Sequence, residues 1–274
     1  MTGFRLGDRA AALGYRLAAF DSIGSTSTEA AEAARAGDDG NIWFAALEQT
    51  AGRGRRGRQW DSQHGNLAAS LLFLPEAEPE LVATLGFVAG IALNEALRQV
   101  VPEASLRQGI DGADGAGGRI ALKWPNDVLA DGAKLAGILL EAIRRVDGRQ
   151  AVVIGFGVNV VAAPDGLPYP ATSLKALGFE VSAGTVFAAL SETWIDALEL
   201  WDSGGGLAKV LARWREAAAG IGAEVAVARE GDVVRGTFET IDDAGRLIVR
   251  AGDHSTITIT AGDVHFGVTA TAGQ

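Results

Sequence analysis

The chain changes character near residue 222, and this change constrains the fold more than any other feature. From about residue 20 to 218, short apolar segments alternate with longer segments rich in alanine and leucine, a pattern typical of strands and helices in one α/β region. After residue 222, five short segments of alternating apolar residues follow one another, separated by Gly- and Asp-containing turns. Such a run predicts a small β-barrel or a similar module. We therefore expect two domains, residues 1–220 and 221–274.

The first domain has the pattern of a mixed β-sheet flanked by helices, an α/β (α+β) arrangement. Strands are expected at residues 42–49, 66–74, 120–124, 128–130, 133–144 and 151–161. Helices are expected at residues 26–35, 80–100, 183–202 and 206–218. Thr26 and Glu29 fit a capping box that starts the first of these helices. Asp131-Gly132 predicts a hairpin turn between two strands.

Composition excludes several classes of site. The chain has 48% hydrophobic and 21% charged residues, which is ordinary for a globular protein. It has no cysteine, so disulfides, thiol catalysis and cysteine metal sites are excluded. The three histidines, His64, His254 and His265, match no metal-ligand spacing. The apolar run at residues 85–93 is shorter than a membrane span and no signal peptide is recognised, so we expect a cytoplasmic protein without a membrane partner.

One cationic loop stands out in this acidic chain. The formal net charge is −10, yet residues 52–58 consist of four arginines and three glycines. Glycine lets backbone N–H groups approach an anion, and guanidinium forks match phosphate oxygens. We expect a loop of mutually repelling arginines to be mobile when empty and ordered when it closes on an anion. A polyphosphate small molecule or a nucleic-acid backbone fits, and the overall charge disfavours the second. A solvated turn explains the composition equally well.

Three further stretches attract attention. In K-W-P-N-D, residues 123–127, the proline forces Trp124 to be extended, so we expect its ring to offer an aromatic surface while Lys123 faces the opposite side. In K-L-A-G-I-L-L-E, residues 134–141, a lysine opens a very apolar strand. In G-F-G-V-N-V, residues 155–160, two glycines interrupt another buried strand.

Glycine inside a strand weakens it unless something needs close backbone approach. Gly137, Gly155 and Gly157 therefore suggest a flat ligand lying against backbone, with Lys134 near its anionic group. The alternatives are a strand-to-turn junction, a surface lysine beside a β-bulge, and tight packing of a neighbouring element.

The order and spacing of these stretches is specific where each alone is not. Over about residues 20–200 the series closely resembles the biotin protein ligases, through S-T at 25–26, E-Q-T-A-G-R-G-R-R-G-R-Q-W at 48–60, K-W-P-N-D, K-L-A-G-I-L-L-E and G-F-G-V-N-V. The resemblance implies a catalytic domain similar to that of class II aminoacyl-tRNA synthetases, plus an SH3-like C-terminal domain. It also implies that biotin and MgATP form biotinyl-5′-AMP, and that a lysine of a biotin carboxyl carrier protein then receives the biotin.

The resemblance assigns roles residue by residue. Catalytic roles are implied for Lys134, Arg55 and Asp127, the last orienting or deprotonating the incoming lysine. Biotin-binding positions are Ser25, Thr26, Ser27, Gln49, Gly52, Arg53, Gly54, Arg55, Lys134, Gly137, Ile138, Gly155 and Gly157. Positions for ATP and the adenylate are Arg53, Arg55, Arg58, Trp60, Lys123, Asn126 and Asn159. Mg²⁺ accompanies ATP, and no side chain is assigned as its ligand.

The chain departs from the family pattern in places. Ser27 stands where many family members carry asparagine, which leaves a contact there open. The Gly-rich stretch 109–118 has no derived role. Only residues 1–24 precede Ser25, too few for the helix-turn-helix domain of some family members, so we expect no DNA partner. The protein is expected to be a monomer or a homodimer. The alternatives are a lipoate or octanoate ligase, and an RNA-binding module disfavoured by the net charge.

Overall fold

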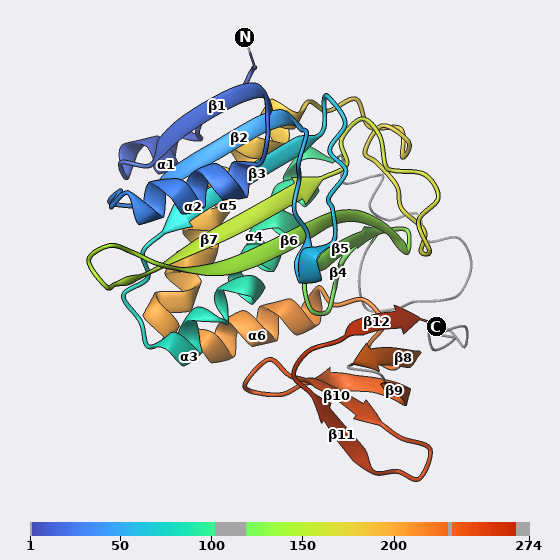
Figure 1. Cartoon of the computed structure of the whole chain (residues 1–274). Coiled ribbons are helices and arrows are strands. Elements are labelled where there is room, and N and C mark those ends of the chain that lie inside the picture. Colours follow the sequence, from blue (N-terminus) through green and yellow to red (C-terminus); the bar gives the residue numbers. More distant parts are fainter. Residues whose placement is uncertain (1, 102–118, 230–231, 267–274) are drawn as a thin grey trace.

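A seven-stranded mixed sheet forms the larger part of the molecule (Figure 1). The computed structural model describes residues 2–101, 119–229 and 232–266. The strands are β1 (Arg16–Ile23), β2 (Ile42–Gln49), β3 (Leu67–Phe73), β4 (Ile120–Lys123), β5 (Asp127–Ala130), β6 (Ala133–Arg144) and β7 (Gln150–Val158). Their order is β1-β2-β3-β7-β6-β5-β4; β1 and β2 run parallel and the other neighbours antiparallel. The expected mixed sheet is confirmed, with strand ends shifted by a few residues.

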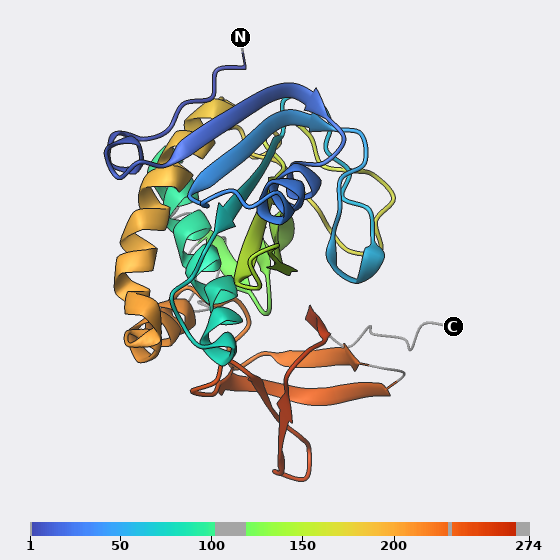
Figure 2. The ribbon, with the colours of Figure 1, turned by 60° about the vertical axis from the view of Figure 1, so that its left-hand side comes forward.

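Helices cover both faces of this sheet. They are α1 (Asp8–Ala12), α2 (Thr26–Arg35), α3 (Pro79–Val82), α4 (Leu85–Val100), α5 (Ala183–Trp201) and α6 (Leu207–Glu216). In Figure 2, α4 and α5 lie against one face and α2 against the other. The alanines of α2, at positions 30, 31 and 34, pack on Phe44 and Leu72 in a small core of their own. Small side chains there let the helix approach the sheet closely.

The start of α2 differs from the sequence prediction. The N-cap is Ser25, whose hydroxyl accepts a hydrogen bond from the Thr28 N–H at 3.4 Å, whereas Thr26 is the first helical residue. The Thr26 hydroxyl instead contacts Gln49 and Ser70 on the neighbouring strands. The capping box at Thr26 was therefore wrong by one position, because its hydroxyl serves tertiary contacts. The predicted end at Arg35 is confirmed.

The helix expected at residues 80–100 is two helices, α3 and α4, separated near Thr84. The Thr84 hydroxyl donates to the Leu81 carbonyl at 2.6 Å and accepts from the Trp201 indole at 2.9 Å, which fixes the junction. By length and composition alone, Pro79–Val100 is apolar enough to cross a membrane, and 67% of its apolar window is buried inside the protein. This burial under the sheet and against α5 accounts for its composition.

The β5–β6 hairpin follows the sequence prediction. Asp131 and Gly132 have φ angles of 48° and 76°, as the two central residues of a type I′ turn require. A register shift between Val128 and Leu129 then rotates the end of β5 relative to β6. The Gly-rich stretch 109–118 lies outside the described residues.

The C-terminal strands form a second, antiparallel sheet below the first (Figure 1). They are β8 (Glu224–Arg229), β9 (Asp232–Ile241), β10 (Leu247–Arg250), β11 (Thr256–Ile259) and β12 (Asp263–Phe266), in the order β11-β10-β9-β8-β12. Among the described residues no ladder joins β11 to β12, so the sheet is open and the closed barrel was not found. The all-β character of this region is confirmed.

Two hydrogen bonds are among the contacts that join the second sheet to the larger part of the molecule. The buried indole of Trp124 donates a hydrogen bond to the Gly245 carbonyl at 3.0 Å. The Arg215 guanidinium donates to the Ile241 carbonyl at 2.8 Å. Trp124 was expected to offer an aromatic surface; the residue is 2% exposed, and its indole N–H binds the second sheet.

Candidate active site

A cavity of about 610 Å³ opens where α2, the arginine loop (residues 52–58), the β5–β6 hairpin, β7 and β12 meet. Its volume suits a small-molecule ligand. Most residues predicted from the sequence line it, namely Thr26, Ser27, Gln49, Arg53, Gly54, Arg55, Arg58, Trp60, Lys123, Asn126, Asp127, Lys134, Gly137, Ile138, Gly155 and Gly157. Stretches separated by more than a hundred residues in the sequence thus share one site.

Three predicted residues do not line the cavity. Ser25 caps α2. Gly52 lies against the loop's own backbone, since a Cβ there would overlap the Trp60 carbonyl oxygen. Asn159 is buried: its amide donates to the Thr172 carbonyl at 3.1 Å, and its Oδ1 has no hydrogen-bond partner in the described part of the chain. These positions support the cavity from outside.

The inner end of the cavity is polar. The Thr26 N–H donates to Gln49 Oε1 at 2.8 Å, and the Thr26 hydroxyl lies 2.8 Å from the Ser70 hydroxyl. Ser27 lies 3.3 Å from Ser70, and all three hydroxyl side chains are buried. Ser70 was missed, although a lone serine within the apolar strand 67–73 is a signal, because buried hydroxyls need partners. This end can hydrogen-bond a compact polar head group.

Two contacts hold the arginine loop on the side of the larger sheet. Arg53 forms an ion pair with Glu141 of β6. Arg55 donates to Asn126 Oδ1 at 2.8 Å, and Asn126 in turn donates to the Ile138 carbonyl at 2.6 Å. Burial lowers the pKa of Arg55, which nevertheless stays charged because an arginine titrates far above neutral pH.

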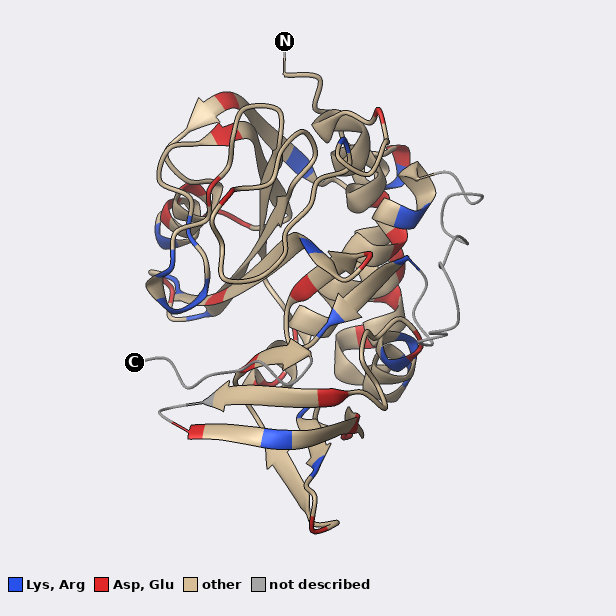
Figure 3. Ribbon diagram, turned by 90° about the vertical axis from the view of Figure 1, so that its right-hand side faces the viewer, with Lys and Arg blue, Asp and Glu red and all other residues tan. Residues whose placement is uncertain are grey.

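On the other side, the loop contacts the C-terminal sheet. Asp263 of β12 lies 2.8 Å from Arg58 and 3.4 Å from Arg56. Figure 3 shows lysine and arginine colour concentrated in this loop, on the side that faces the second sheet. Carboxylates from distant parts of the sequence thus offset the mutual repulsion of the arginines.

Trp60 lies inside the cavity. A Cβ added at Gly157 would overlap the Trp60 indole, and one added at Gly137 would lie 3.2 Å from its Cζ3. A flat apolar group does lie against these glycines, as expected, but in this structure it is the protein's own tryptophan. Gly155 faces Ser27 instead, with its Cβ position 3.2 Å from the hydroxyl.

Lys134 lies at the centre of the charged end. Its ammonium is 2.7 Å from Asp127 Oδ1. It also lies 5.6 Å and 5.5 Å from the ring centroids of Trp60 and Tyr169, within cation–π range. Lys123 was expected on the side opposite Trp124, but both residues line the cavity; the Lys123 ammonium lies 4.0 Å from Asp127, and burial lowers its pKa.

The sequence analysis missed part of the lining. These residues are Gln59, Ala69, Ser70, Trp124, Pro125, Leu139, Phe156, Leu167, Pro168, Tyr169, Ala228, Asp263, Val264 and His265. Those on β8 and β12 had no local signal, since only the docking of the second sheet brings them to the cavity.

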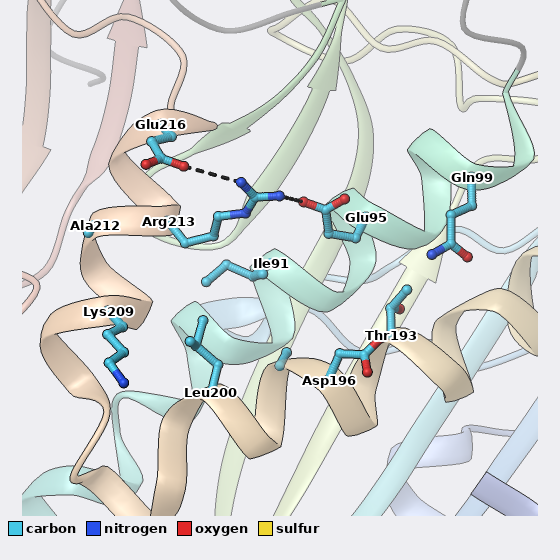
Figure 4. A pocket seen from close by; sticks show the side chains of 11 residues that line it. Ile91, Glu95, Gln99, Thr193, Asp196, Leu200, Lys209, Ala212, Arg213 and Glu216 are labelled. Atoms are coloured by element: carbon cyan, nitrogen blue, oxygen red, sulfur yellow. Dashed lines mark hydrogen bonds and ion pairs between the residues drawn. The ribbon is translucent and has the colours of Figure 1, made fainter. Parts of the chain in front are cut away.

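A second groove lies between α4, α5 and α6, with a volume of about 650 Å³. Figure 4 shows Arg213 between Glu95 and Glu216, with N–O distances of 2.6 and 3.2 Å. The Arg213 charge is thus paired with both carboxylates. Within the described ranges, no group of three or more His, Asp or Glu side chains is arranged to hold a metal ion.

Comparison with known proteins identifies two family matches and a similar relative. The family described as "Biotin/lipoate A/B protein ligase family" matches residues 20–159, and "Biotin protein ligase C terminal domain" matches residues 220–267. A biotin–[acetyl-CoA-carboxylase] ligase of Paracoccus denitrificans is 40% identical over 252 residues, covering 89% of this chain and 97% of the relative.

Solved structures agree on the fold. A biotin protein ligase from Aquifex aeolicus in complex with biotin and ATP has a TM-score of 0.72 at 22% identity, covering 92% of this chain and 98% of that one. A biotin protein ligase from Leishmania major in complex with biotinyl-5-AMP has a TM-score of 0.60 at 25% identity, covering 90% and 99%. The chain therefore belongs to the biotin/lipoate A/B protein ligase family, and within it to the biotin protein ligases.

Proposed function

We infer that this chain is an ATP-dependent biotin–[acetyl-CoA-carboxylase] ligase, which makes biotinyl-5′-AMP and transfers biotin to a carrier lysine. The observation that carries this conclusion is that one cavity combines a polar inner end, the arginine loop and the Lys134–Asp127 pair. These three features suit the activity named for the 40% identical relative. The polar inner end suits a neutral polar head group, Lys134 suits a carboxylate, and the arginine loop suits a polyphosphate.

We propose that the inner end binds the ureido head of biotin through Thr26, Ser27 and Gln49. The biotin carboxylate then lies towards Lys134, which stabilises charge at the reacting centre. A carboxylate oxygen forms a bond to the α-phosphorus of ATP, and the bond from that phosphorus to the bridging oxygen of the β-phosphate breaks. Pyrophosphate carries away the electron pair, and Arg55 and Arg58 neutralise phosphate charge.

In the second step the carrier lysine attacks the acyl carbon of the adenylate. Its amine nitrogen forms the amide bond, the bond from the acyl carbon to the phosphate oxygen breaks, and AMP leaves. The attacking amine loses a proton, and Asp127 is the carboxylate placed to accept it. Closure of the arginine loop excludes water from the labile anhydride meanwhile.

Further assignments are proposals with weaker support. Mg²⁺ enters with ATP as part of that substrate, held chiefly by phosphate oxygens. A boundary at 220/221 is supported by the start of β8 at Glu224 and by the C-terminal family match from residue 220. We also propose a cytoplasmic location, which the need for ATP supports.

The experiment follows the second half-reaction. Purified protein, ATP, Mg²⁺ and biotin are mixed with a biotin carboxyl carrier domain, and intact mass is measured. The proposal expects a mass increase of one biotinyl group, lost when the acceptor lysine is replaced by arginine. Lipoate replaces biotin in a parallel reaction, because the matched family also includes lipoate ligases. Modification by lipoate and not by biotin would overturn the assignment.

A further inference from the structure

Asp263 is a carboxylate of the C-terminal sheet that reaches into the catalytic cavity. It begins β12, the edge strand nearest the arginine loop, and it lines the cavity. Its Oδ2 lies 2.8 Å from a nitrogen of Arg58 and 3.4 Å from one of Arg56, across 205 and 207 residues of sequence. Asp263 belongs to none of the sequence stretches that carried the resemblance, and nothing in the local sequence around 263 predicts the contact.

The charge of Asp263 is secured by its surroundings. Burial by itself would raise its pKa, but Arg58, by charge and hydrogen bond, and then Arg56 and Arg55 hold the pKa below its ordinary value. The side chain is 27% exposed, compared with 65% for Arg58. Asp263 is therefore a fixed anion on the cavity wall, whereas Arg58 is a more mobile partner.

The loop that Asp263 contacts is ordered internally by few bonds. The Gly54 N–H donates to the Arg58 carbonyl at 2.8 Å, the Arg58 N–H to the Arg55 carbonyl at 3.1 Å, and the Trp60 N–H to the Gly52 carbonyl at 3.0 Å. Arg56 has a φ angle of 55°, an uncommon conformation for a residue other than glycine. External contacts must help to hold such a loop in place.

We propose that Asp263 is a positioning residue that latches the arginine loop across the cavity before substrate binds, and that it yields Arg58 to the triphosphate of ATP. This inference rests on the proposed function, because it needs a polyphosphate substrate. Asp263 and the triphosphate are both anions and compete for the same guanidinium. When ATP binds, Arg58 therefore exchanges one counterion for another. Asp263 of the C-terminal sheet is its counterion before ATP binds, and the triphosphate is its counterion afterwards.

Loop order tests the latch without any substrate. Amide hydrogen exchange of Gly54, Arg58 and Trp60 is measured on the ligand-free full chain. Asp263→Asn should speed this exchange about two- to fivefold, as expected for loss of a partly exposed ion pair. Glu239→Gln is the matched control, since it removes an ion-paired carboxylate from the same sheet, far from the loop. Asp263→Glu should restore most of the protection.

Two readouts separate a charge latch from a merely structural role. Raising the salt concentration should speed loop exchange more in the parent protein than in Asp263→Asn, because salt screens ion pairs and, among the described residues, the variant's loop keeps only the Arg53–Glu141 pair. Arg58→Gln should match Asp263→Asn, and the double variant should show no further loss. Arg58→Gln changes an exposed loop residue, so the test survives if Asp263→Asn fails to fold. Equal exchange in the parent protein and Arg58→Gln would overturn the latch.

The exchange of counterions is tested by kinetics. In biotin-dependent pyrophosphate exchange, Asp263→Asn should lower the KM for ATP about two- to fivefold, with the change in KM rather than kcat. A raised KM for ATP would contradict the competition. If the parent protein gives no biotin-dependent pyrophosphate exchange, the proposed function is refuted. The amide hydrogen exchange of the loop would still decide whether the latch exists.

Discussion

The ammonium of Lys134 lies 2.7 Å from the carboxylate of Asp127, between the aromatic rings of Trp60 and Tyr169. Both charged side chains are about one fifth exposed, so the pair is only partly screened by water. In the proposed mechanism, Lys134 lies beside the biotin carboxylate in the first step, and Asp127 lies beside the acyl carbon in the second. One ion pair thus connects the two half-reactions.

Replacing Lys134 by methionine keeps the length of the side chain and removes its charge. We expect kcat/KM for biotin-dependent pyrophosphate exchange to fall about 10²- to 10³-fold, because a positioned charge at the reacting centre is lost. Lys209→Met is the control, since Lys209 lies in the groove beside α6 and not in the cavity. Equal rates in the two variants would contradict the role of Lys134.

Asp127→Asn should impair transfer more than activation. An amide cannot accept the proton of the acceptor lysine, so transfer from preformed biotinyl-5′-AMP should slow about 10²- to 10⁴-fold. The rate of pyrophosphate exchange should fall less, because Lys134 loses only its ion-pair partner. Equal losses in both half-reactions would show that Asp127 only positions Lys134.

Arg55→Gly should release the adenylate. Arg55 is half-buried and bound to Asn126, so its removal frees one side of the loop and opens the cavity to water. The expected result is faster dissociation of biotinyl-5′-AMP, by about tenfold or more for one lost charge-assisted contact, measured by rapid gel filtration. A variant that retains the adenylate as tightly as the parent protein would contradict this view of the loop.

Gly157→Ala should displace Trp60. The added Cβ would overlap the indole, whereas the Cβ of Gly137→Ala would lie 3.2 Å from it, so the second change should be milder. Dissociation of biotinyl-5′-AMP measures the effect, with Gly157→Ala the faster of the two. In a Trp60→Ala background the difference should vanish; its persistence would mean that the glycines serve another contact.

Trp124→Phe tests the junction between the sheets. The change leaves the buried Gly245 carbonyl without its donor, and we expect a loss of about 1–3 kcal/mol in the free energy of unfolding in urea. Trp43→Phe is the control, since Trp43 is equally buried and its indole N–H has no hydrogen-bond partner in the described ranges. An equal loss in both would assign the cost to packing.

Local signals predicted the elements and most of the cavity. The Asp131-Gly132 turn, the strand 42–49 and the end of α2 at Arg35 depend on short-range chemistry and are confirmed. The capping box failed because the Thr26 hydroxyl bonds to neighbouring strands, and tertiary contacts override local capping.

Contacts that form only when the second sheet docks could not be predicted from local sequence patterns. Alternation along β4 placed Lys123 and Trp124 on opposite sides, but the strand ends at Lys123, and the second sheet draws Trp124 towards Gly245. The counterions of the arginine loop, Glu141 and Asp263, lie 88 and 205 residues from their partners. No local pattern encodes such a pairing.

Biotin-dependent exchange between ATP and pyrophosphate tests the central claim most directly. The purified full chain is incubated with ATP, Mg²⁺ and labelled pyrophosphate, with biotin in one reaction and lipoate in another. The account predicts label entering ATP with biotin and not with lipoate. A folded protein that gives no exchange with biotin, or gives exchange only with lipoate, would contradict it.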